Sequence, residues 1–334
     1  MSALPDTGTG DATESGATQS FIGMLEPIAL AATRAAAAAC ERWLGREDAD
    51  GADRAATKAM REVLGGAQGT GTVIIGEGEK DEAPMLHNGE RLGTGSEPNF
   101  DVAVDPLEGT KLCSKGLPGA LTTLAVAEEG SMWDPGPGLY MDKLVVGPAA
   151  REAIDITDSP ESNLGRIAEA LGKPVEDLLV VVLDKPRHED LISRLRHAGA
   201  AVFTPSDGDV AGSLAAVLED GPADALMGIG GTPEGVMTAC AVASLGGGMQ
   251  GRLAPQSSDE TEALASAGMD VDHVLELEEL VGGESMFVAT GVSGGDLLNR
   301  PIRSGGRLVT ESIVIAGGHV RRTVESSPEP GGVK

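Results

Sequence analysis

The sequence predicts an α/β protein with a mixed N-terminal half and a C-terminal half built on a largely parallel sheet. From about residue 151, apolar runs of roughly five to eight residues alternate with helical segments, as in strand–helix–strand units. Before that point, two helical segments precede several short apolar runs. A chain of 334 residues is also longer than one hydrophobic core usually supports. We therefore expect two packed halves, 21–150 and 151–324, between disordered tails at 1–20 and 325–334.

The N-terminal half opens with helices. Residues 21–44 are rich in alanine, a strong helix former, and residues 52–64 form a second helical run that Gly65 ends. Short apolar runs bounded by Gly or Pro follow, and these are expected to be strands. Pro106 lacks an N–H and is expected to end the second of them. The predicted strands of this half are 71–79, 101–105, 121–127 and 139–146.

The C-terminal half reads as strands and helices in alternation. Its apolar runs are rich in Val, Leu and Ile, as in strands that are buried on both faces. The predicted strands are 177–184, 200–204 and 223–231, followed later by 284–291, 306–317 and 318–324. The predicted helices are 189–199, 208–220 and 232–247.

The composition argues against nucleic acids and anionic membranes as partners. Acidic residues outnumber basic residues by 52 to 25, which gives a formal net charge of -27. Phosphate backbones are bound by clustered Lys and Arg, and base-stacking surfaces need aromatic side chains, which make up only 2% here. The acidity is interpreted mainly as a solvated surface.

Cysteine usage and the N-terminal segment favour a reducing cytoplasm. The three cysteines are far apart and show no CxxC or Cys/His spacing, so neither a disulfide scaffold nor a structural zinc site is expected. The first residues have no basic start and no apolar core of the kind found in a signal peptide. The apolar stretch 21–40 is interrupted by Glu26 and Arg34, which favours a buried helix over a membrane span.

Carboxylates recur where a strand ends or a helix begins, and glycines flank most of them. Oxygen ligands favour Mg²⁺ or Mn²⁺ over zinc, and two such ions about 4 Å apart can activate a water and neutralise a leaving phosphate oxygen. A Thr110 hydroxyl bonded to a nearby carboxylate could orient that water. The alternative is that these residues are only helix caps and turns. The carboxylates are Asp48, Asp50, Asp53, Glu77, Glu79, Asp81, Glu82, Asp105, Glu108 and Glu234.

Cationic side chains near a predicted strand end suit an anionic substrate. The segment LDKPRHED supplies Lys185, Arg187 and His188, and an Arg fork there could bind a phosphate, although the three could equally be surface residues of a helix start. In SDGDVAG, Asp207 and Asp209 are either helix caps or acceptors for the hydroxyls of a polyol. The glycine spacing of GIGGTPEG does not match a dinucleotide-binding loop.

Six motifs taken together resemble the class II fructose-1,6-bisphosphatases. They are GEGEKDEAPML, DPLEGT, LYMDKLVVGP, DKPRH, DGDVAG and GIGGTPEGV, and the similarity spans about residues 20 to 325. The cyanobacterial-type enzymes, which also hydrolyse sedoheptulose-1,7-bisphosphate, are especially similar. DPLEGT is also a variant of the signature of the lithium-sensitive phosphatase superfamily. The resemblance implies a layered αβαβα sandwich, with metal binding in the first half and substrate binding in the second.

The resemblance also implies roles for individual residues. The metal-binding set is Asp53, Glu77, Asp105, Glu108 and Glu234. The positions tied to catalysis are Asp53, Asp81, Thr110 and Glu234. The substrate-binding positions are Glu108, Gly109, Thr110, Tyr140, Lys185, Pro186, Arg187, Asp207, Gly208, Asp209 and Gly231.

One segment departs from the family pattern. Family members usually read Gly-Lys/Arg-Gly-Asp-Lys where this chain reads GREDA, with Glu47 in place of a glycine and Ala49 in place of a lysine. A lost ammonium beside a metal and phosphate site removes a local positive charge.

The sequence is thus read as a cytoplasmic, Mg²⁺- or Mn²⁺-dependent phosphatase that removes the 1-phosphate of fructose-1,6-bisphosphate, with sedoheptulose-1,7-bisphosphate as a further substrate, and as a homo-oligomer, either dimer or tetramer. One alternative is a related phosphatase for inositol phosphates or phosphonucleotides. The other is a degenerate homologue that binds a sugar phosphate and regulates without hydrolysis.

Overall fold

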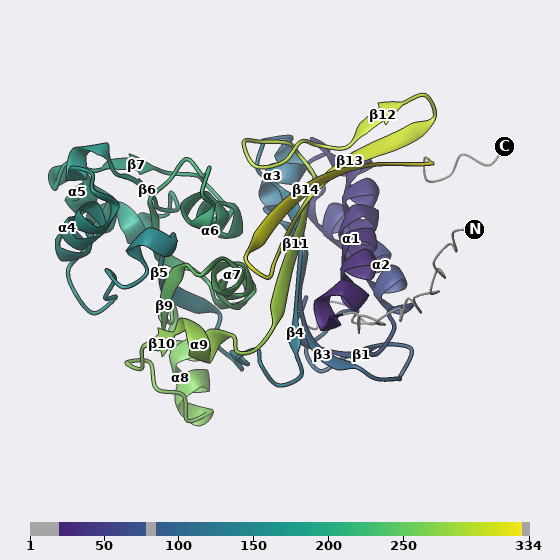
Figure 1. Cartoon of the computed structure of the whole chain (residues 1–334), viewed down its shortest axis with the longest axis horizontal. Coiled ribbons are helices and arrows are strands. Elements are labelled where there is room, and N and C mark those ends of the chain that lie inside the picture. The colour runs from purple at the N-terminus through teal and green to yellow at the C-terminus, as the bar shows by residue number, and fades with distance from the viewer. Residues whose placement is uncertain (1–19, 78–84, 329–334) are drawn as a thin grey trace, which may run out of the picture.

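The computed structural model describes residues 20–77 and 85–328. The predicted N-terminal tail, except for Ser20, and the predicted catalytic Asp81 lie outside the described residues. The described chain is a mixed α/β structure with two sheets and helices on both sides of each (Figure 1).

The predicted helices and strands appear in the predicted order, among further elements that were not predicted. The helices are α1 (Phe21–Cys40), α2 (Ala49–Leu64), α3 (Thr110–Lys115), α4 (Pro160–Leu171), α5 (Glu189–His197), α6 (Asp209–Val217), α7 (Thr232–Leu245), α8 (Ser258–Ser266) and α9 (Leu277–Leu280). The strands of the first sheet are β1 (Thr70–Ile75), β2 (Arg91–Gly93), β3 (Asn99–Glu108), β4 (Leu121–Glu128), β11 (Ser285–Gly291), β12 (Ile302–Ser304), β13 (Arg307–Ala316) and β14 (His319–Pro328). Those of the second are β5 (Tyr140–Val146), β6 (Leu179–Val181), β7 (Ala201–Phe203), β8 (Ala225–Gly231), β9 (Gly248–Leu253) and β10 (Leu275–Glu276).

The central strands of the first sheet are buried on both faces. Its strands run in the order β12-β13-β11-β4-β3-β1-β2, and β14 also pairs with β13. Helices α1 and α2 pack on one face with Met286 and Val288, and α7 packs on the other with Phe287 and Ala289. Successive strand residues point to opposite faces, so a strand covered on both sides is apolar throughout. This explains why the four residues Met286 to Ala289 in the middle of β11 are all apolar.

The second sheet is mixed, so the prediction of a largely parallel sheet is wrong. Its order is β10-β9-β5-β8-β6-β7, in which β6 pairs parallel with β7 and β8, whereas β5 pairs antiparallel with β8 and β9. Strands β8 and β9 have the same direction, as expected for strands joined by a crossover helix. The difference arises because β5, from outside the alternating region, inserts between them.

Sheet membership does not follow the predicted division at residue 150. Strand β5 precedes that position but lies in the second sheet, and β11 to β14 return from the C-terminal half to complete the first sheet. Residues 325–328, which were predicted to begin a disordered tail, form the end of β14, while 329–334 lie outside the described residues. The two predicted halves therefore exchange strands.

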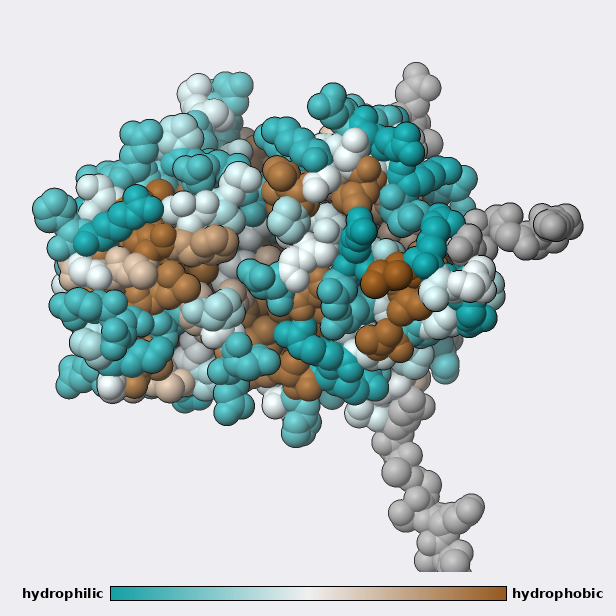
Figure 2. Space-filling view, turned by 90° about the horizontal axis from the view of Figure 1, so that it is seen from above, coloured by the Kyte–Doolittle hydropathy of each residue, from teal (hydrophilic) through white to brown (hydrophobic). Residues whose placement is uncertain are grey.

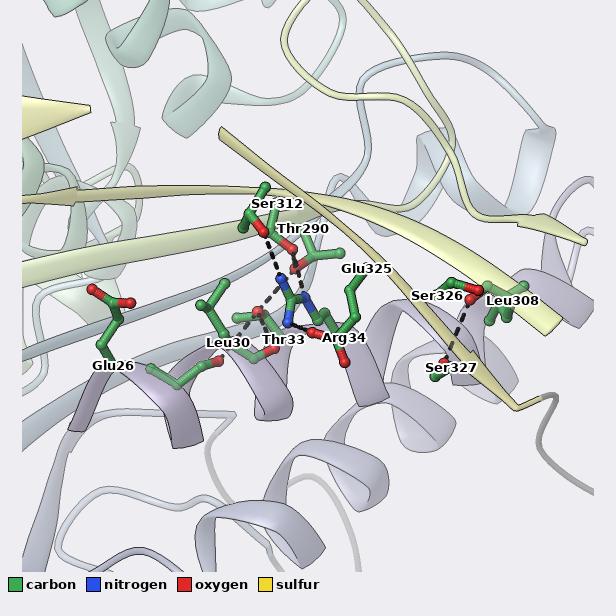
Figure 3. A network of polar contacts seen from close by, with 12 residues as sticks. Glu26, Leu30, Thr33, Arg34, Thr290, Leu308, Ser312, Glu325, Ser326 and Ser327 are labelled. Atoms are coloured by element: carbon green, nitrogen blue, oxygen red, sulfur yellow. Dashed lines mark hydrogen bonds and ion pairs between the residues drawn. The ribbon is translucent and has the colours of Figure 1, made fainter. Parts of the chain in front are cut away.

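A polar network holds β14 against α1 (Figure 3). The Arg34 guanidinium donates to Ser312 Oγ at 3.2 Å and pairs with Glu325. Beside the guanidinium, Thr290 and Ser312 share a hydrogen bond at 2.9 Å, and both side chains are buried. Because buried hydroxyls are costly unless they are bonded, this network fixes how the helix sits on the sheet.

Helix α1 is the one segment among the described residues that is long and apolar enough to cross a membrane by length and composition. In the structure its inner face packs on α2, β4 and β11, and its N-cap is Ser20, which accepts from Gly23 N–H at 3.0 Å. Core helices of soluble proteins have the same length and composition, and the packing matches the predicted buried helix.

Candidate active site

The end of β3 contains a bulge that carries two carboxylates. Strand β3 continues through Pro106 to Glu108, so the predicted end at Pro106 is wrong, and its register with β4 shifts between Asp105 and Glu108. A bulge accommodates proline because the extra residues need no ladder bond. Asp105 Oδ1 accepts from Leu107 N–H at 3.0 Å within this turn.

Two helices begin beside this bulge. The Glu108 side chain is 3% exposed, and its Oε1 accepts from Val210 N–H in the first turn of α6 at 3.3 Å. Glu234 lies in the first turn of α7. The positive ends of helix dipoles favour anions at these positions. The Oε2 atoms of both glutamates are buried and have no hydrogen-bond partner within the described ranges.

Glycines at the end of β8 make this arrangement possible. A Cβ on Gly231 would lie 1.7 Å from Glu234 Oε2, and a Cβ on Gly230 would lie 2.0 Å from Asp209 Oδ2. No side chain could occupy either position without displacing a carboxylate. The GIGG run is therefore explained by the close approach of acidic side chains, and Gly231, a predicted substrate-binding position, borders the site.

The carboxylates act on one another. Burial raises the pKa of Asp105 well above its usual value, and the charges of Glu77, Glu108 and Glu234 raise it further. Burial likewise raises the pKa of Glu108, and it raises that of Glu234 to about 7. Asp207 and Asp209 contribute to the last two shifts. Acidic residues that follow β1 or lie in or beside β3, α6 and α7 thus raise one another's pKa values.

Asp53 of α2 belongs to the same neighbourhood. Burial raises the pKa of the Cys40 thiol, and the charges of Cys113, Asp53 and Asp105 add to this shift. The charges of both aspartates therefore act on the same thiol. Of the predicted metal set, all five residues lie in the described part of the chain, and the charges of Glu77, Glu108 and Glu234 act on Asp105.

The donor set fits a divalent cation by its chemistry. As arranged, the described side chains include no group of three or more Asp, Glu, His or Cys residues positioned around one ion. The fit rests on other observations: two buried carboxylate oxygens without a donor, and pKa values raised by burial and by like charges. Buried charges require a counterion, and oxygen ligands match Mg²⁺ or Mn²⁺.

Lys143 is a site residue that the sequence analysis did not identify. It is 2% exposed, pairs with Asp209, and donates from Nζ to the Gly231 carbonyl at 2.9 Å. Its charge also lowers the pKa of Glu234, against the effects of burial and Asp209. A signal was present, because Met141, Lys143 and Val145 share one face of β5 and only the lysine is polar.

Cationic and aromatic groups lie beyond the acidic cluster. Lys185 Nζ donates to the Ser206 carbonyl at 2.7 Å and lies 3.8 Å from an Asp207 oxygen. The Arg187 guanidinium lies 5.2 Å from the Tyr140 ring centroid, a cation–π distance. Pro186 begins a single helical turn that follows Lys185 and contains Arg187. The predicted substrate residues of the DKPRH and LYMDKL motifs are therefore neighbours.

Thr110 begins α3 directly after Gly109, whose φ of 75° favours glycine. Its hydroxyl donates to the Leu107 carbonyl at 2.9 Å, and within the described ranges no bond to a carboxylate accompanies this one. The bulge explains this difference, because it turns the Leu107 carbonyl toward the start of α3. Gly208, with φ of 96°, brings the backbone before α6 to Glu108: a Cβ there would lie 3.6 Å from Oε2.

An elongated apolar cavity of about 800 Å³ adjoins the site. It is bordered by Asp207 and Gly208 on one side and by α3, α6 and β7 elsewhere. Figure 2 shows the molecule from above relative to Figure 1. On this upper face, apolar residues lie among hydrophilic ones.

The segment that departs from the family pattern lies at the start of α2. Glu47 has φ of 59°, a left-handed conformation that favours glycine. Ala49 is the first residue of α2 and stands one helical turn before Asp53. A lysine at Ala49 would share the helix face of Asp53. The backbone has thus kept the glycine conformation although the glycine is replaced.

We predict that, with a chelator present, the protein loses stability as the pH rises. Between about 4.5 and 7 the native state keeps a proton on Glu234 that the unfolded state has lost, so the free energy of unfolding falls across this window, by about 3 kcal/mol for this group. Thermal unfolding in EDTA at pH 5.5 and pH 8 measures this. Manganese should raise the melting temperature more at pH 8 than at pH 5.5, and equal stability at both pH values in EDTA would contradict the prediction.

Comparison with known proteins reveals the relatives of this chain. The profile of the family described as "Bacterial fructose-1,6-bisphosphatase, glpX-encoded" matches residues 25–327. The chain is 44% identical over 299 residues to a Haemophilus influenzae protein named "Fructose-1,6-bisphosphatase class 2", covering 85% of this chain and 90% of the relative. It is 41% identical over 299 residues to "Fructose-1,6-bisphosphatase 1 class 2" of Escherichia coli, covering 85% and 89%.

Proposed function

Since the chain belongs to the bacterial glpX-encoded fructose-1,6-bisphosphatase family, we propose that its buried acidic site hydrolyses the 1-phosphate of fructose-1,6-bisphosphate to the monophosphate and inorganic phosphate. The protein is a phosphoric monoester hydrolase. The observation that carries the assignment of the site is the convergence of buried carboxylates from β3, α6 and α7 beside the cations of the DKPRH motif.

The acidic side of the site is assigned to divalent cations. Members of this family depend on a divalent metal, and we assign Mg²⁺ or Mn²⁺ to Asp53, Glu77, Asp105, Glu108 and Glu234. When bound, such ions supply positive charge that neutralises phosphate oxygens and acidifies a water. The residues themselves provide the buried carboxylates whose charge the ions balance. Lys143 pairs with Asp209, and its charge lowers the pKa of Glu234.

The cationic side is assigned to the substrate. Arg187 and Lys185 can donate to phosphate oxygens, and the Tyr140 ring supports the guanidinium. Asp207 and Asp209 face the sugar hydroxyls in this proposal. Thr110 at the start of α3 and Asp81, which lies outside the described residues, are the proposed groups that orient the attacking water.

The packing is consistent with the five-layer αβαβα sandwich of sugar phosphatases: α1 and α2, the first sheet, α6 and α7, the second sheet, then α4 and α5 (Figure 1). We assign this architecture to the chain, together with a cytoplasmic location and a homo-oligomeric state.

A phosphate-release assay on purified protein tests the function. We expect release from fructose-1,6-bisphosphate with Mn²⁺ or Mg²⁺ and a loss of at least a hundredfold in EDTA, because the carboxylates then repel the substrate. Sedoheptulose-1,7-bisphosphate, inositol 1-phosphate and a 3′-phosphonucleotide complete the panel. Release only from the last two would favour a related phosphatase. Tight binding of sugar phosphate without release from any compound would favour a regulator, the alternative that Ala49 motivates.

A further inference from the structure

The backbone of Ile229 in β8 is held at its N–H and at its carbonyl by consecutive residues. Its N–H donates to His188 Nε2 at 2.8 Å. Its carbonyl accepts from Arg187 Nε at 3.1 Å and from Nη2 at 2.8 Å. Three nitrogen atoms from one helical turn therefore contact the backbone of a single residue. Strand β8 is in turn anchored, because Ile229 lies opposite Asp142 of β5.

The His188 ring is fixed as a neutral acceptor. It is 2% exposed, and its Nδ1 lies 2.7 Å from the Leu183 carbonyl, which can only accept. Nδ1 must therefore carry the proton, which leaves Nε2 free to accept from Ile229. Burial lowers the pKa of His188, and the charges of Arg187 and Lys185 lower it further, against opposing effects of the Leu183 bond and Asp142. The sequence offered His188 as a possible cation for an anionic substrate. The buried environment of the ring favours its neutral form instead.

Strand β8 approaches this ring closely. A Cβ on Gly228 would lie 3.0 Å from His188 Nε2, and Gly228 has φ of 115°, a conformation open to glycine. The bond to Ile229 is thus part of a tight contact between the DKPRH turn and the strand. Two residues after Ile229, strand β8 ends at Gly231, and α7 follows with Glu234 in its first turn.

These contacts determine the orientation of the Arg187 guanidinium. Nε and Nη2 are used on the Ile229 carbonyl, the guanidinium lies over Tyr140, and Nη1 makes no hydrogen bond within the described ranges. The orientation of the one remaining nitrogen therefore depends on where the Ile229 carbonyl points. The N–H and the carbonyl of one strand residue point to the same side of the strand, so the bond from Ile229 N–H to His188 holds the residue in the orientation that directs its carbonyl at Arg187.

We propose that His188 is a positioning residue that holds the Ile229 backbone so that Arg187 presents its guanidinium to a phosphate of the substrate. The inference rests on the proposed role of Arg187 in binding the sugar bisphosphate. His188 does not touch the reacting atoms, so it should affect substrate binding and leave the chemical step nearly unchanged.

Two variants separate the two bonds of the ring. In His188→Gln the side-chain carbonyl can reach the Nε2 position and keep the acceptor for Ile229. In His188→Asn the shorter amide reaches only the Nδ1 position and keeps the donor to Leu183. We expect KM for fructose-1,6-bisphosphate to rise about tenfold in H188N and to stay within about threefold in H188Q, with kcat within about threefold in both. Thermal melting of each variant checks the fold.

The outcomes decide the inference. A wild-type KM in H188N, an equal defect in H188Q and H188N, or a fall in kcat alone would overturn it. Nitrogen-15 NMR of the wild-type imidazoles, assigned by comparison with H188Q, gives a test independent of activity. A protonated Nδ1 with an unprotonated Nε2 supports the inference, and a protonated Nε2 overturns it. A wild-type protein without phosphatase activity would instead reject the proposed function, and the NMR result would still decide the role of the ring.

Discussion

Replacing Glu234 by glutamine is expected to lower kcat/KM for fructose-1,6-bisphosphate by about a thousandfold or more. The substitution keeps the shape of the side chain but removes a negative charge from the proposed metal set. Loss of a metal's contribution to transition-state charge stabilisation amounts to several kcal/mol, and each 1.36 kcal/mol corresponds to about a factor of ten. Steady-state kinetics with saturating Mn²⁺ measure the effect.

The same variant should be more stable than the wild type in EDTA at pH 8. The wild-type carboxylate is buried with one oxygen unpaired, and its pKa is raised to about 7 mainly by burial. A neutral amide avoids this cost, and we expect a gain of about 1–3 kcal/mol in the free energy of unfolding. A variant that loses activity but gains stability shows that the charge of Glu234 serves function and not folding.

The control is Glu169→Gln, which changes an exposed glutamate of α4 in the same way. It should alter neither activity nor stability beyond about 0.5 kcal/mol. An E234Q enzyme that keeps a tenth or more of the wild-type kcat/KM would contradict the assignment of Glu234 to the metal set.

Replacing Lys143 by methionine is expected to destabilise the protein by about 3–5 kcal/mol. Its ammonium is buried, pairs with Asp209 and donates to the Gly231 carbonyl. Removing one partner leaves an uncompensated buried charge and an unpaired carbonyl. Urea unfolding at pH 7.5 in EDTA measures the loss. Activity should also fall, because Asp209 is a proposed contact of the sugar.

Two further variants make this prediction specific. In Lys173→Met the lost ion pair, with Asp224, involves a lysine that is 45% exposed, and the expected cost is at most about 1 kcal/mol. In the double variant K143M/D209N both charges are removed, so part of the lost stability should return. A K143M protein no less stable than K173M would contradict the account of the buried pair.

The sequence predicted the elements better than their arrangement. The apolar runs at β4, β8 and β11 and the helix at α7 lie within a few residues of their predicted positions. The mixed second sheet could not be predicted. The hydrophobic pattern of β5 predicts a strand but does not determine which sheet that strand joins. The same limit applies to β11, β13 and β14, which return to the first sheet from a long distance along the chain.

The site shows a similar division. Motif positions such as Glu108, Glu234 and Asp209 were predicted, and the structure brings them together because the β3 bulge faces the first turns of two helices. Lys143 and the bond between His188 and Ile229 were missed, since both depend on contacts between elements that the sequence does not place. The bond of the Thr110 hydroxyl to the Leu107 carbonyl was not foreseen, because it depends on the bulge in β3.

If these buried carboxylates share divalent ions, anomalous diffraction from crystals grown with Mn²⁺ will locate the ions among them. We expect anomalous peaks within about 2.3 Å of the carboxylate oxygens of Asp105, Glu108 and Glu234. Strong peaks bound only by other residues, with these three side chains uncoordinated at a pH above 7, would contradict this expectation.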